Sequence, residues 1–167
     1  TALLGRAKIE LAHGADGLQH MFLNGEDVTQ EIRRHQISAY ASKVSAIPEV
    51  RTFLLEMQRE LARTHNVIMD GRDIGTVVLP NADVKIFLTA APEDRARRRW
   101  KELRSRGEDT AFQAVLSDVI QRDEDDSNRS AAPLCRAEDA ILVDTTGNSL
   151  ERSFDLLLDT IKERLGQ

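Results

Sequence analysis

The sequence predicts an α/β fold in which a parallel sheet is flanked by helices, with a small antiparallel insert near its start. From residue 66 onward, segments of strand and helix character follow in the order strand, helix, helix, strand, helix. Before that point, short runs of alternating apolar and polar residues are separated by glycine-containing turns, which is typical of β-hairpins. With 167 residues, the chain has the length of one domain and can bury a core.

In the first part of the chain, residues 7–24 predict a hairpin. Asn24-Gly25 predicts a second tight turn directly after it. A helix is expected over residues 36–46, and Pro48 begins an amphipathic helix at the helix-start position that proline favours.

In the second part, apolar runs and helix signals alternate. Pro92 is followed by two acids that favour a first helical turn, and Gly107 ends that helix. Thr110 is expected to cap the next helix. The remaining expected elements are strands at 67–69, 83–89 and 140–144 and a last helix whose apolar stripe runs from Leu150 to Leu165.

Composition narrows the classes of function. The net charge of −5 disfavours bulk nucleic-acid binding. The single cysteine, Cys135, cannot form an internal disulfide, so a reducing cytoplasmic location is expected. No apolar run approaches 18 residues, so no membrane span is expected. The four histidines show no metal-ligand spacing, and no protein metal site is predicted.

Asp70-Gly71-Arg72-Asp73 follows the apolar run at 67–69 and is the first candidate site. Open parallel sheets bind ligands beyond the carboxyl ends of their strands, and an arginine there can hold a phosphate bidentately. A turn stabilised by pairing between aspartate and arginine explains the same residues equally well.

An arginine-rich stretch is the second candidate. Arg95, Arg98 and Arg99 are three and four residues apart and share one helix face, where an anion could neutralise them. On spacing alone, a solvated face paired with nearby acids is favoured, namely with Glu93, Asp94 and Glu102.

The third candidate lies at the end of the following helix. Arg122, Asp126 and Arg129 face one side if the helix continues, and they suit a sugar-phosphate, with the acid for ribose hydroxyls and guanidinium groups for phosphate. A frayed, charged helix end is the alternative. Ser42 and Arg51, each taken alone, are expected to be ordinary surface residues.

Together these segments resemble the bacterial-type cytidylate kinases, a family of nucleoside monophosphate kinases. The likeness covers nearly the whole chain in the family's order. The stretches that carry it are residues 22–29, 41–44, 48–51, 70–78, 84–88, 95–99, 122–129 and 132–134. The resemblance implies a three-layer parallel sheet in one domain, with an insert at 8–34, a core at 35–91 and 131–167, and a lid at 92–130.

The resemblance also implies an activity, the transfer of the terminal phosphoryl group of ATP to CMP or dCMP with Mg²⁺. The cytosine base would be surrounded by Ser42, Arg51, Asp73 and Arg129. The CMP phosphate would be held by Arg72 and Arg122, and the ribose hydroxyls by Asp126. Arg95, with Arg98 or Arg99, would close over the donor phosphates as part of the lid, so the implied catalytic residues are Arg95, Arg98, Arg99 and Arg122.

One family feature does not occur in the sequence. None of the nine glycines opens a Gly-x-x-x-x-Gly-Lys-Ser/Thr loop, which grips the donor phosphates in such kinases. We therefore expect the chain to lack a front unit and to be inactive or weakly active alone, and self-association could complete its sheet. A CMP-binding module or pseudokinase without phosphoryl transfer is the alternative.

Overall fold

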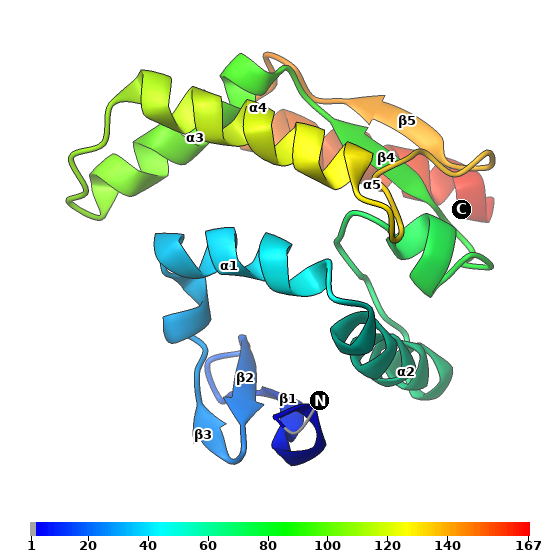
Figure 1. The fold of residues 1–167 in the computed structure, drawn as a ribbon. Helices are drawn as coiled ribbons and strands as arrows, with labels where there is room; N and C mark the ends of the chain where they lie inside the picture. The colour runs from blue at the N-terminus through cyan, green and yellow to red at the C-terminus, as the bar shows by residue number, and fades with distance from the viewer. Residues whose placement is uncertain (1–2) are drawn as a thin grey trace. The chain divides into compact units, whose positions relative to one another are not determined.

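The computed structural model describes residues 3–167, apart from the side chains of His35, Gln36, Ser38, Ala39 and Ser42. The chain divides into two compact units, Thr1–Asn66 and Val67–Gln167 (Figure 1). Among the described residues, no helix is both long enough and apolar enough to cross a bilayer.

The first unit begins with the predicted antiparallel insert. A short 3-10 turn, Leu4–Arg6, precedes a sheet of order β1-β2-β3, formed by Ile9–His13, Gln19–Leu23 and Glu26–Asp27. In the β2–β3 turn, Asn24 and Gly25 adopt positive φ angles of 53° and 86°, as a tight two-residue hairpin turn requires. Both predicted turns of this insert are therefore confirmed.

Two helices follow in the same unit. After a 3-10 turn at Glu31–Arg33, α1 spans His35–Ser45 and α2 spans Pro48–Thr64. Pro48 occupies the first helical position of α2, where its missing N–H and fixed φ do no harm. The predictions for this part of the chain are confirmed in type and within one residue at the α1 boundaries.

The second unit contains the predicted parallel pair. β4, Ile86–Thr89, and β5, Ile141–Asp144, are parallel, with Ile86 opposite Ile141. Three helices belong to this unit (Figure 1): α3, Pro92–Ser105; α4, Phe112–Asn128; and α5, Leu150–Leu165. A single wide turn, η3, covers Ile74–Val78 before β4. The α/β class and the parallel pairing are confirmed.

Two expectations for this unit are wrong. Residues 67–69 form no strand, and Ile68 is 99% exposed. An extended segment needs a neighbour for its ladder of hydrogen bonds, and the parallel sheet of the described residues consists of β4 and β5 alone. Thr110 does not cap α4, whose N-cap position is Ala111; the Thr110 carbonyl instead accepts a hydrogen bond from Trp100 Nε1 at 2.9 Å.

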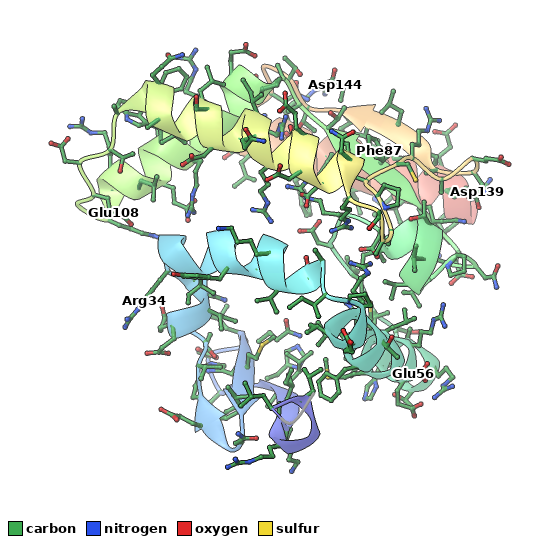
Figure 2. The ribbon with its side chains drawn as sticks, viewed as in Figure 1. Arg34, Glu56, Phe87, Glu108, Asp139 and Asp144 are labelled. Atoms are coloured by element: carbon green, nitrogen blue, oxygen red, sulfur yellow. The ribbon has the colours of Figure 1, made fainter. Side chains whose placement is uncertain are left out.

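The best-buried cluster lies between α3 and α4. Ala96 and Leu103 of α3 are fully buried, and Val115 of α4 is 2% exposed. Trp100 and Phe112 flank them and meet edge to face, with ring centroids 6.3 Å apart. The two helices therefore form a firmly packed hairpin, with Glu108 in the connection between them (Figure 2).

In the antiparallel insert, a histidine on β2 contacts acids of the β1–β2 turn and of β3. His20 on β2 lies between two carboxylates, with Nδ1 3.0 Å from Asp27 Oδ2 and Nε2 3.2 Å from Asp16 Oδ2. The hydrogen bond to Asp27, and then that to Asp16, raise the pKa of His20 above its ordinary value of 6.5. Hydrogen bonds from Thr29, and then from His20, lower the pKa of Asp27 to about 2.

This arrangement makes the insert sensitive to pH. Because the pKa of His20 is raised on folding, its contribution to stability is complete below pH 6.5 and is lost as the pH rises through the raised value. We expect the Asp27→Asn change to lower the pKa of His20 more than Asp16→Asn does, as measured by NMR titration of the imidazole ring. Titration of wild-type His20 at or below 6.5 would contradict this expectation.

Candidate active site

The carboxyl ends of β4 and β5 are tied together by Thr145, which directly follows β5 and is 3% exposed. Its backbone N–H and its hydroxyl both donate to the Thr89 carbonyl, at 2.8 and 3.1 Å. Asp144, the last residue of β5, lies at this end (Figure 2) and accepts from the backbone N–H and hydroxyl of Thr146. These bonds, from the Thr146 hydroxyl first, lower the pKa of Asp144. Ligands bind beyond this end of a parallel sheet.

A buried carboxylate gathers the predicted acceptor residues. Asp126, near the end of α4, is 2% exposed. Its Oδ2 lies 3.0 Å from Arg72 Nε and 3.8 Å from Arg122 Nε. Its Oδ1 lies 3.7 Å from Arg129 Nη1, and Arg129 Nη2 lies 3.6 Å from Asp73 Oδ1. The structure thus brings Arg72, Asp73, Arg122, Asp126 and Arg129 together.

The charges of this Asp126 cluster, defined as those five residues, favour an anion. Three guanidinium groups against two carboxylates leave one net positive charge. A carboxylate is buried at acceptable free energy only with such partners, because it loses its hydration. Arg72 and Arg122 remain 37% and 45% exposed, so they can contact a ligand and Asp126 together.

The backbone after α4 holds the cluster in shape. Arg129, the C-cap of α4, donates from Nε to the Ala132 carbonyl at 2.7 Å. The Leu134 N–H donates to the Asp126 carbonyl at 2.8 Å. Between these bonds, Ala132 adopts φ 50°, an uncommon conformation for a residue with a Cβ. The tight reversal at 129–134 therefore fixes Arg129 beside Asp126.

The predicted lid arginines all contact protein groups. Arg95 forms a bidentate ion pair with Asp123 of α4, at 3.0 and 2.5 Å. Arg98 donates to the Thr145 carbonyl at 2.7 Å, and Arg99 pairs with Glu102 at 3.0 Å. Of the alternative pairings expected from spacing, the structure contains the one with Glu102. It pairs Arg95 with a different acid, and Asp94 accepts from the Gly147 N–H instead.

Two predicted base-contacting residues belong to the first unit. Arg51 of α2 donates from Nη1 to the Ser45 carbonyl at 3.1 Å, at the end of α1. The side chain of Ser42 lies outside the described residues. Contacts of Ser42 and Arg51 with a nucleotide base stay predictions.

Two residues of this region, Asp123 and Thr145, are not singled out by the sequence alone. Asp123 stands in an unbroken acidic run, where composition does not distinguish one acid from the next. Its spacing could have identified it, because Asp123 follows Val115 and Val119 at steps of four residues and so continues the apolar face of α4. Thr145 carried no signal beyond its place after a strand.

We expect Asp126→Ala to lower the free energy of unfolding by about 3 kcal/mol, because the change leaves arginine charges without their buried partner. Asp125→Ala is the matched control. Its carboxylate is exposed and accepts from Gln121 Nε2, so the variant should stay within about 0.5 kcal/mol of wild type. Equal denaturant midpoints for the two variants would show that Asp126 is not a stabilising centre.

Comparison with known proteins identifies the family. The family model described as cytidylate kinase matches residues 2–163. A cytidylate kinase of Carboxydothermus hydrogenoformans is 50% identical over 159 residues, which are 95% of this chain and 71% of the relative. One of Caldicellulosiruptor bescii is 53% identical over 86% of this chain and 64% of the relative, and one of Thermosipho melanesiensis is 46% identical over 96% and 72%. The chain therefore belongs to the cytidylate kinase family, which is a family of nucleoside monophosphate kinases.

Proposed function

We propose that the protein transfers the terminal phosphoryl group of ATP to CMP or dCMP, giving CDP or dCDP. Family membership supports the reaction type, and the relatives are named cytidylate kinases. The observation that carries the proposal is the Asp126 cluster, a buried carboxylate among three arginines with a net positive charge. Such a cluster suits a nucleoside monophosphate, which offers both hydroxyl groups and a phosphate.

In this proposal, the partly exposed arginines bind the acceptor phosphate. Arg72 contacts Asp126 through Nε, which leaves its two Nη groups for a bidentate contact with phosphate oxygens. Arg122 contacts the same carboxylate from one turn earlier on α4. Asp126 accepts from the ribose hydroxyls while it orients the two guanidinium groups.

Asp73 and Arg129 read the base. Both side chains are nearly buried, at 12% and 11% exposed, and they lie 3.6 Å apart. Cytosine places an amino donor beside ring acceptors, so a carboxylate next to a guanidinium is complementary to it. A role for Ser42 and Arg51 at the base remains a prediction from the sequence.

Phosphoryl transfer needs positioning and positive charge rather than a covalent nucleophile, because the transition state spreads negative charge over the transferred group. Arg95, with Arg98 or Arg99, supplies that charge at the donor phosphates, and Arg122 supplies it at the acceptor. Closure of residues 92–130 as a lid excludes water and so limits hydrolysis of ATP.

Mg²⁺ is implied by the family. Among the residues that the structure describes, no group of three or more histidines, cysteines or acids is arranged to hold a metal. Asp123 of α4 and Asp144 at the end of β5 each accept hydrogen bonds from protein groups. The described side chains therefore form no cage of three or more protein ligands, and no step proposed for them depends on a bound ion.

Three narrower predictions remain part of the proposal. The first is that the donor-phosphate loop lies outside these 167 residues, so that the chain alone is inactive or weakly active. The second is self-association to complete the sheet, and the third is a cytoplasmic location. Assays of the 167-residue chain beside the protein from its complete reading frame test the first, and sedimentation tests the second.

The direct test mixes CMP and ATP with the protein expressed from its complete reading frame and measures CDP. We expect Asp73→Ala to lower kcat/KM for CMP by about 10- to 100-fold, because a hydrogen bond to a charged group is worth about 1.5–3 kcal/mol. Asp83→Ala, an exposed residue before β4, is the control and should match wild type. CMP binding by calorimetry without any CDP would show a binding module and refute phosphoryl transfer.

A further inference from the structure

Two nitrogens of the Arg95 guanidinium donate to the two oxygens of the Asp123 carboxylate. Arg95 Nη1 lies 3.0 Å from Asp123 Oδ1, and Nη2 lies 2.5 Å from Oδ2. A planar fork that meets both oxygens of a carboxylate fixes the plane of the guanidinium as well as its distance. The two side chains are 30% and 28% exposed, so water competes little for the contact.

A third contact ties the same group to the sheet. Arg95 Nε donates to the Ala90 carbonyl at 2.9 Å, and Ala90 directly follows β4. Three of the five N–H donors of the guanidinium are therefore used by protein groups, and two remain for an anion. The group is held in place at the carboxyl end of β4, where a ligand of a parallel sheet is expected.

Asp123 lies on α4 between the apolar contact with α3 and the residues of the Asp126 cluster. It follows Val119 by one turn of α4, so the ion pair extends the apolar contact between α3 and α4. It is also next to Arg122 and three residues before Asp126. Arg122 and Asp126 of the proposed acceptor site and Asp123, the partner of Arg95, therefore lie within less than two turns of α4.

We propose that Asp123 is a positioning residue for phosphoryl transfer: it holds Arg95 in register with the acceptor residues of α4, so that Arg95 meets the donor phosphates. Asp123 acts through Arg95 and does not touch the substrate. The inference rests on the proposed function and adds to it a residue that links the donor and acceptor sides through one helix.

The test uses Asp123→Asn in the protein expressed from its complete reading frame. Asparagine keeps the shape but offers one acceptor atom and no charge, so Arg95 loses its bidentate partner. We expect kcat to fall at least tenfold and KM for ATP to rise, while the Kd for CMP from calorimetry stays unchanged. Asp125→Asn, the same change two residues later on the exposed side of α4, should keep wild-type values.

A double variant separates positioning from simple stabilisation. If Asp123 acts only through Arg95, then Asp123→Asn combined with Arg95→Lys lowers kcat no further than Arg95→Lys alone. The inference is overturned if Asp123→Asn matches the Asp125→Asn control, if it weakens CMP binding in parallel with kcat, or if the two losses add. Wild-type protein that binds CMP but forms no CDP would instead overturn the proposed function, and this inference with it.

Discussion

The second unit is organised around one carboxyl side chain that is almost entirely shielded from water. Asp126 is 2% exposed, and three guanidinium groups replace the hydration that it has lost. That requirement joins segments that are distant in sequence, because Arg72 comes from the loop before η3 and Arg129 from the end of α4. It also explains the uncommon backbone of Ala132, since the chain must reverse tightly to keep Arg129 beside the carboxylate.

Apolar packing and an ion pair stabilise different parts of the contact between α3 and α4. Ala96, Leu103 and Val115 make a small dry centre, and the pair formed by Arg95 and Asp123 closes one end of it. Removing Arg95 or Asp123 would leave the remaining charge unpaired and partly shielded from water, which costs free energy. The apolar side chains of the cluster lose their hydration without any such cost. The charged end of the helix pair is thus more sensitive to substitution than its exposed surface.

The sequence predicted best what local chemistry determines. Asn24-Gly25 specifies its turn and Pro48 its helix start, because φ angles alone settle both. Residues 67–69 have the composition of a strand, but a strand also requires a neighbour that the local sequence does not encode. The resemblance to cytidylate kinases placed Arg72, Asp73, Arg122, Asp126 and Arg129 in one site, which the motifs taken singly did not. Asp123 was not singled out, since only packing shows which acid of a run faces inward.

The arginine-rich run on α3 shows how contacts divide residues that look alike in sequence. The five arginines of α3 share the helix with Lys101, and like charges at such spacing repel each other unless they are neutralised or separated. Arg97 and Arg104 lie over the rings of Phe112 and Trp100, Arg98 holds the loop after β5, Arg99 meets Glu102, and Arg95 meets Asp123. Among these partners, Asp123 is the one on α4 that forms an ion pair with an arginine of α3. It lies within two turns of Arg122 and Asp126 on the same helix. Arg95 is therefore the arginine of this run that an ion pair joins to the helix of the proposed acceptor residues.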